Sequence, residues 1–136
     1  MSREIKFRAW DKEDKIMDYN IALVGNRILF EYSIEDDCIE FNSYVDINEE
    51  NKKYFEIMQF TGFKDMNGKE IYEGDILQVS KEYSGSFQPT IVVFEDGCFK
   101  GQAYHKLTPP FVIETPITTL EVVGNIYENK ELLEEQ

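Results

Sequence analysis

Apolar and polar residues alternate with a period of two near the start of the chain, which is the spacing of a strand with one buried face. The apolar set is Ile5, Phe7 and Ala9, and the intervening set is Lys6, Arg8 and Trp10. The alternation predicts that the first set faces the core and that the second set projects together from the opposite face. A charged stretch at residues 11–15 then predicts a turn.

Turn residues between short apolar runs predict a series of β-hairpins. The strongest signal is Asn67-Gly68, because a type I′ turn needs a positive φ at both central residues and these two types tolerate it best. The expected turns lie at Gly25-Asn26, Asp36-Asp37, Asn67-Gly68, Glu73-Gly74-Asp75, Asp96-Gly97 and Gly124-Asn125. The crowding of two turns into about ten residues has the rhythm of a small barrel or roll.

Helical signals are confined to two short stretches. Asn48 and the acids that follow it predict a helical turn, and Asn129 is expected to cap a short terminal helix. A polar segment at residues 81–89 is expected to be a loop. The pattern as a whole predicts a mainly β protein with short helices.

The length and composition indicate how many domains the chain forms and in which cellular compartment it acts. The chain has 136 residues, 42% hydrophobic and 14% aromatic, which suffices for one compact domain with its own core. No run approaches the roughly 20 apolar residues that cross a bilayer, and we recognise no export signal, so we expect no membrane association. Cys38 and Cys98 lie far apart without ligand spacing, so we expect reduced thiols in a cytoplasm.

The charge restricts the class of partner. Twenty-seven acidic residues against 14 basic ones leave a net charge of -13, which repels the phosphate backbone of nucleic acids. Nucleic-acid binding is therefore disfavoured, whereas a basic protein would be attracted.

Residues suited to catalysis or metal binding are sparse. His105 is the single histidine, and Cys98 lies seven residues before it, but no third orienting residue or oxyanion-hole motif accompanies the pair. An isolated histidine is the simpler interpretation. Adjacent acids such as Asp36-Asp37 point to opposite faces of a strand and chelate poorly. We expect no enzyme activity, no metal and no cofactor.

The candidate binding residues are Lys6, Arg8 and Trp10. Basic and aromatic side chains interleaved on one strand face suit base stacking with phosphate contacts, or a protein contact built on Trp and Arg. The alternative is an ordinary strand with Trp10 folded over an edge of the core.

Four blocks of the sequence resemble the YopX family of phage and prophage proteins. They are residues 5–11 (IKFRAWD), 58–77 with its run TGFKDMNGKEIYEGD, 92–97 (VVFEDG) and 122–129 (VVGNIYEN). The resemblance implies an SH3-like barrel in the later part, residues 58–136, with a short C-terminal helix. It is preceded by a hairpin-rich segment at residues 1–57, and the two segments are expected to pack together as one compact unit. It also implies an origin in a phage or prophage, and it supplies no catalytic residues, since the family lacks an established biochemical role.

These observations lead to three ranked hypotheses. The first is a non-catalytic binding or self-assembly module in the cytoplasm of a bacterial host, whose partner is a second copy or a host or phage protein. The second is a single-stranded nucleic-acid binder that uses the Lys6, Arg8 and Trp10 face. The third is an enzyme, for which the sequence offers no recognisable site.

Overall fold

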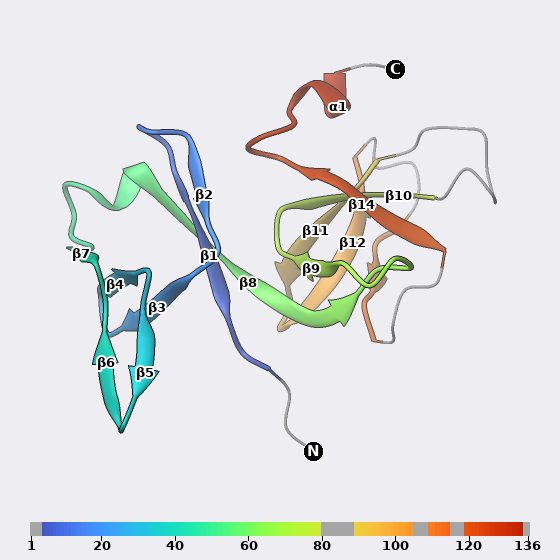
Figure 1. Cartoon of the computed structure of the whole chain (residues 1–136). Helices are drawn as coiled ribbons and strands as arrows, with labels where there is room; N and C mark the ends of the chain where they lie inside the picture. The colour runs from blue at the N-terminus through green and yellow to red at the C-terminus, as the bar shows by residue number, and fades with distance from the viewer. Residues whose placement is uncertain (1–3, 80–88, 105–108, 115–118, 135–136) are drawn as a thin grey trace. The chain divides into compact units, whose positions relative to one another are not determined.

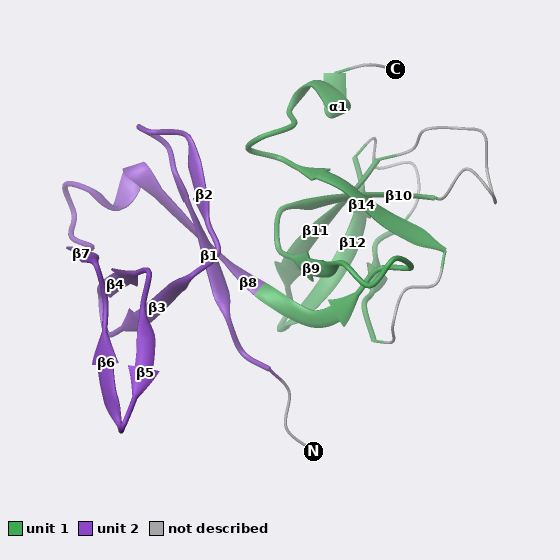
Figure 2. Cartoon of the chain, in the orientation of Figure 1, with its two compact units in different colours: residues 1–3, 60–136 green, residues 4–59 purple. Residues whose placement is uncertain are grey.

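The fold is mainly β, as the alternation predicts (Figure 1). The computed structural model describes residues 4–79, 89–104, 109–114 and 119–134. The chain divides into two compact units between Gln59 and Phe60 (Figure 2). Unit 2 holds Glu4–Gln59, and unit 1 runs from Phe60 onward.

Unit 2 is built from short antiparallel strands. They are β1 (Phe7–Asp11), β2 (Ile16–Asp18), β3 (Ile21–Val24), β4 (Arg27–Phe30), β5 (Ser33–Glu35), β6 (Cys38–Glu40), β7 (Ser43–Asp46) and the first half of β8 (Phe55–Lys64). Strand β1 lies between β2 and β8, the order β3-β4-β7 forms a second sheet, and β5 pairs with β6 in a separate hairpin.

The core of unit 2 collects apolar side chains from both sheets. Ala9, Ile21 and Ile28 are buried together. The partly buried residues around them are Phe7, Phe30, Val45, Ile47 and Phe55. The expected inward face of β1 is therefore confirmed for Phe7 and Ala9. It is wrong for Ile5, which precedes the strand and is 62% exposed.

Unit 1 is a curved antiparallel sheet in the order β13-β12-β11-β10-β14. Its strands are β10 (Asp75–Val79), β11 (Thr90–Glu95), β12 (Cys98–Ala103), β13 (Phe111–Val112) and β14 (Leu120–Asn125), and the second half of β8 pairs with β9 (Glu70–Tyr72). The buried core is Ile71, Leu77, Val92, Phe99 and Ile113. This arrangement is consistent with the expected barrel or roll, while its likeness to SH3 domains stays a prediction.

Most predicted turns occur where the sequence places them, but the turn expected at Gly124-Asn125 is wrong, because both residues end strand β14 and the turn follows at residues 126–128. Both residues of Asp36-Asp37 have a positive φ (50° and 63°), and so do both residues of Asp96-Gly97 (54° and 79°), as a type I′ turn requires. Gly25 (φ 63°) opens the two-residue connection from β3 to β4, and Gly74 (φ 84°) lies between β9 and β10.

The hairpin at Asn67-Gly68 exists, but the expected type I′ turn is wrong. Only Gly68 has a positive φ there, at 81°. The Gly68 N–H donates to the Asp65 carbonyl at 3.0 Å, and the Asp65 N–H donates to the Lys69 carbonyl at 2.8 Å. This is the pattern of a three-residue loop that ends with a glycine in the left-handed region.

The helical stretches are shorter than the sequence suggests. A single 3₁₀ turn, η1 (Lys52–Tyr54), follows Asn48, whose Oδ1 accepts the N–H groups of Glu50 and Asn51 at 2.8 and 2.9 Å. The terminal helix α1 spans Glu131–Glu134. No helix among the described residues is long and apolar enough to cross a membrane. The polar loop predicted at residues 81–89 lies outside the described residues except for Pro89.

Candidate functional site

The predicted face of Lys6, Arg8 and Trp10 is not an exposed surface. Arg8 is 1% exposed and Trp10 is 8% exposed, so the expectation that they project into solvent is wrong. Lys6 is partly exposed and forms an ion pair with Glu4 at 3.5 Å. The physical reason is that both faces of β1 are covered, since the consecutive residues Arg8, Ala9 and Trp10 are all buried.

Arg8 is held within unit 2 by an aromatic neighbour. Its Nη1 donates to the Tyr19 hydroxyl at 3.3 Å, and its guanidinium carbon lies 5.7 Å from the centroid of the Tyr19 ring. Trp10 is covered, so it offers no open ring for a base to stack on. This placement agrees with the alternative of a core-edge Trp10, while any binding role of the three residues stays a prediction.

The candidate catalytic and metal-binding residues are not brought together in the part that the structure describes. Cys38 and Cys98 are both free thiols. His105 lies outside the described residues, so its pairing with Cys98 stays untested. The described residues contain no group of three or more His, Cys, Asp or Glu side chains that could hold a metal ion.

Asp65 is a buried carboxylate whose oxygens bind backbone groups. Its Oδ1 accepts the N–H groups of Asn67 and Lys69 at 2.8 and 2.9 Å, and its Oδ2 accepts the Val122 N–H at 2.8 Å. The carboxylate thus fixes the loop after β8 and ties it to β14. These hydrogen bonds give the buried Asp65 carboxylate a structural role, because they provide the partners that a buried polar group needs.

Asn125 organises the end of β14 in the same way. Its Oδ1 accepts the N–H groups of Tyr127 and Glu128 at 3.0 and 2.8 Å, and its own N–H donates to the side-chain oxygen of Asn129 at 3.0 Å. A Cβ atom on Gly124 would lie 2.5 Å from that oxygen. Asn129 therefore braces this turn with its side chain instead of capping the terminal helix as expected.

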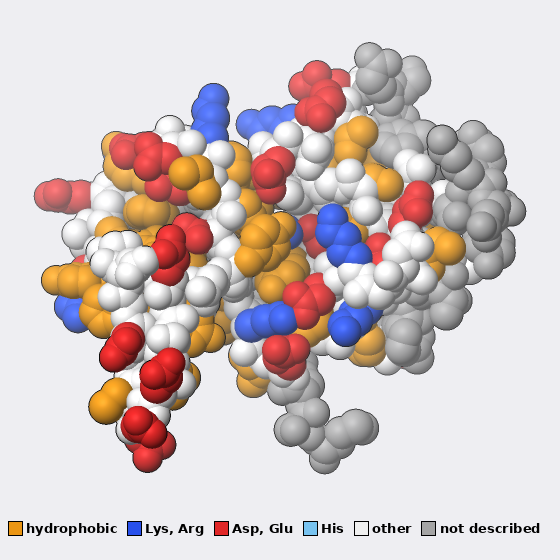
Figure 3. Space-filling model, viewed as in Figure 1, with side chains coloured by type: hydrophobic (Ala, Val, Ile, Leu, Met, Phe, Trp, Pro, Cys, Tyr) orange, Lys and Arg blue, Asp and Glu red, His pale blue; other side chains and the backbone are white. Residues whose placement is uncertain are grey.

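A surface of a different character lies on the β5–β6 hairpin, residues 33–40, which we call the acidic hairpin. All six of its strand residues are exposed. Ile34 and Ile39 face each other across the hairpin and are 63% and 48% exposed. Figure 1 shows the acidic hairpin extending as an arm of unit 2, and Figure 3 shows acidic side chains gathered towards its tip.

The geometry of the acidic hairpin separates its side chains by type. Directly paired residues share a face, so Ile34 and Ile39 lie on one face, and the Glu35–Cys38 and Ser33–Glu40 pairs lie on the other. The turn residues Asp36 and Asp37 add two carboxylates at the tip. The hairpin therefore has one apolar face, two glutamates on the opposite face and two aspartates in the turn.

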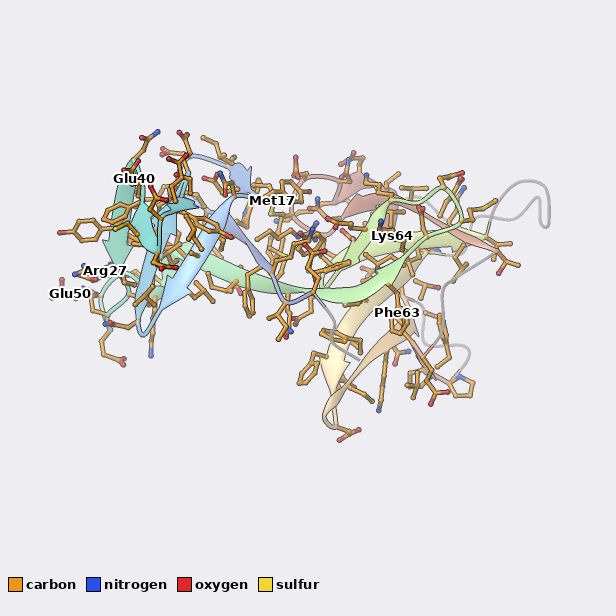
Figure 4. All side chains as sticks on the ribbon, turned by 60° about the horizontal axis from the view of Figure 1, so that its bottom comes forward. Met17, Arg27, Glu40, Glu50, Phe63 and Lys64 are labelled. Carbon is orange, nitrogen blue, oxygen red and sulfur yellow. The ribbon has the colours of Figure 1, made fainter. Side chains whose placement is uncertain are left out.

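Two exposed aromatic residues follow the acidic hairpin in the chain. Phe41 and Tyr44 are exposed, and their rings meet edge to face with centroids 5.8 Å apart. The guanidinium carbon of Arg27 lies 4.3 Å from the centroid of the Tyr44 ring. Its Nε and Nη2 donate hydrogen bonds to the two carboxylate oxygens of Asp46, at 2.7 and 3.2 Å. Arg27 and Glu40 are both labelled in Figure 4.

Two carboxyl groups of unit 2 have shifted pKa values. Hydrogen bonding to Arg27 lowers the pKa of Asp46, so that carboxylate stays ionised and neutralises the guanidinium. On β2, burial raises the pKa of Asp18, and the nearby charges of Glu31 and Asp11 raise it further. The sequence pattern predicted the β5–β6 strand pair, but it gave no signal that its isoleucines would stay exposed.

The comparisons with known proteins cover nearly the whole chain. The family model described as YopX protein matches residues 6–134. Protein EF1440 from Enterococcus faecalis, known from a crystal structure, is 31% identical, with a TM-score of 0.75 over 97% of this chain and 99% of that chain. YopX from Bacillus subtilis is 22% identical, with a TM-score of 0.58 over 93% and 95% of the two chains. The search of curated proteins found no match. The chain therefore belongs to the YopX protein family.

Proposed function

We propose that this protein is a non-catalytic binding or self-assembly module of a phage or prophage, that it acts in the cytoplasm of the bacterial host, and that the acidic hairpin makes its contacts. The observation that carries the proposal is the exposed pair Ile34 and Ile39 on an arm whose residues belong to neither core cluster. Apolar side chains presented together on a surface are typical of protein interaction sites.

The neighbouring residues support a protein contact. Phe41 and Tyr44 are exposed aromatic residues of the kind that contribute strongly to interfaces. Carboxylates around an apolar centre steer association and select partners by charge. A net charge of -13 favours a protein partner over nucleic acid.

A photo-crosslinking amino acid at position 39 tests this proposal in a bacterial host that carries the phage genome. The matched control places the same amino acid at position 16, where Ile16 is 54% exposed but lies on β2 of the same unit. We expect a discrete adduct from position 39 and none from position 16.

The mass of the adduct separates the two forms of the proposal. An adduct with the mass of two copies of the chain indicates self-assembly, and any other discrete mass indicates a host or phage partner. Equal labelling at positions 39 and 16, or no adduct at either, would contradict a binding role for the acidic hairpin.

A further inference from the structure

We infer that the partner contributes an extended segment, alternating apolar residues with Lys or Arg, that adds to the acidic hairpin as a third strand. This inference rests on the proposed function and specifies how the same surface recognises its occupant.

The acidic hairpin has open strand edges among the described residues, because β5 and β6 pair only with each other there. The positive φ of Asp36 and Asp37 gives a two-residue turn, in which the flanking Glu35–Cys38 pair is the hydrogen-bonded one. The next pair, Ile34–Ile39, is then non-hydrogen-bonded, so its backbone N–H and C=O groups point outward. These groups form the template on which another strand pairs.

The two faces of the hairpin specify the side chains of the added strand. Successive residues of any strand point to opposite faces, so a strand added beside β5 meets Ile34 on one face and Glu35 on the other, and a strand added beside β6 meets Ile39 and Glu40 in the same way. Cross-strand neighbours are favourable when apolar groups meet apolar groups and opposite charges meet. A strand that alternates apolar and basic residues satisfies both faces at once.

The charges select against a second copy of the hairpin in this position. Antiparallel pairing of two β5 edges about Ile34 would set Glu35 opposite Ser33 of the other copy, so the glutamate would gain no basic neighbour. Each copy also carries a net charge of -13, which opposes the association of two copies. A basic partner removes that repulsion and gains from the acidic tip.

Two labelled peptides of equal composition test the inference on the full chain. One alternates valine with lysine over about eight residues, a typical strand length, and the other places the valines together and the lysines together. We expect fluorescence anisotropy to show at least about tenfold tighter binding of the alternating peptide, or about 1.4 kcal/mol. We also expect its ¹³C-labelled amide I band to shift to the position of β-strands on binding.

Matched variants locate the contact. The double variant Ile34→Ser with Ile39→Ser, and the double variant Glu35→Lys with Glu40→Lys, should each weaken binding of the alternating peptide about tenfold or more. The controls are Ile16→Ser and the pair Glu49→Lys with Glu50→Lys, which make the same changes at exposed sites outside the hairpin. They should keep the affinity within about twofold. Circular dichroism of each variant verifies folding.

Equal affinity for both peptides, or binding without the strand band, would overturn the third-strand inference. If the crosslink at position 39 forms while the peptides are not distinguished, the binding function stands and this mode of recognition fails. If no crosslink forms but the alternating peptide binds as expected, the recognition mode holds and the cellular role fails.

Discussion

Asp65 shows how one carboxylate holds separate parts of unit 1 together. Both of its oxygens accept backbone N–H groups, two from its own loop and one from Val122 on β14. In Asp65→Asn an NH₂ group replaces one oxygen and cannot accept, so at least one N–H loses its partner. We expect the free energy of unfolding to fall by about 1–3 kcal/mol, measured by urea denaturation.

Asp14→Asn is the control for that measurement, because Asp14 lies exposed in the turn after β1. Its effect should stay within about 0.5 kcal/mol. A loss for Asp65→Asn no larger than that of the control would show that the carboxylate does not join the loop to β14.

Asp18 makes stability depend on pH. Burial, followed by the charges of Glu31 and Asp11, raises its pKa above 3.8, so the folded state binds a proton more readily than the unfolded state. The charged form therefore costs stability above the folded pKa, and this cost disappears as the pH falls towards 3.8.

We accordingly expect Asp18→Asn to be more stable than the natural chain at pH 7, with a difference that shrinks as the pH is lowered. Denaturant titrations of both proteins between pH 7 and pH 4 measure it. A variant that is less stable at pH 7, or a difference that does not change with pH, would refute the electrostatic explanation.

At the scale of elements, the loop before β9 depends on the backbone conformation of one glycine. Gly68 has a φ of 81°, and a Cβ atom there would meet nothing within 4 Å, so the cost of a side chain is conformational. We expect Gly68→Val to lower the free energy of unfolding by more than about 1 kcal/mol, measured by denaturant unfolding.

Gly68→Asn provides the matched comparison, because asparagine tolerates the left-handed region better than valine. It should lose less stability than Gly68→Val. Equal losses for the two variants would mean that the left-handed conformation is not what the position requires.

Elements were predicted best where turn chemistry is local. Asp36-Asp37 and Asp96-Gly97 adopt the expected positive φ at both residues because such a turn depends on its own backbone. Asn67-Gly68 departs from expectation because the distant Val122 and the loop itself share the Asp65 carboxylate, which organises a longer loop. Asn129 does not cap the terminal helix as expected, for a similar reason: its side-chain oxygen accepts the Asn125 N–H.

At the scale of the whole molecule, the net charge and the placement of acids govern association between copies. Because the inferred occupant of the acidic hairpin is a basic strand, and because each copy carries a net charge of -13, we expect any assembly of this chain to use another surface. We expect light scattering behind a size-exclusion column to give the same mass for the natural chain and for the variant Ile34→Ser with Ile39→Ser. The measurement is made at about 50 mM and about 500 mM salt, which changes the screening of surface charges.

A multimer of the natural chain that becomes a monomer in the double variant would contradict this prediction and assign the acidic hairpin to self-assembly. A common mass, whether of one copy or several, would leave the hairpin available for a different protein.

The sequence by itself determined the mainly β class, the positions of most hairpin turns and the alternation of side chains along each strand, because these follow from local backbone preferences and a period of two. Only the tertiary structure decided which alternating residues are covered. Arg8 and Trp10 are buried because both faces of β1 are covered, whereas Ile34 and Ile39 are exposed because their hairpin lies outside both core clusters. Burial depends on neighbours that are distant in sequence, and a local pattern does not contain them.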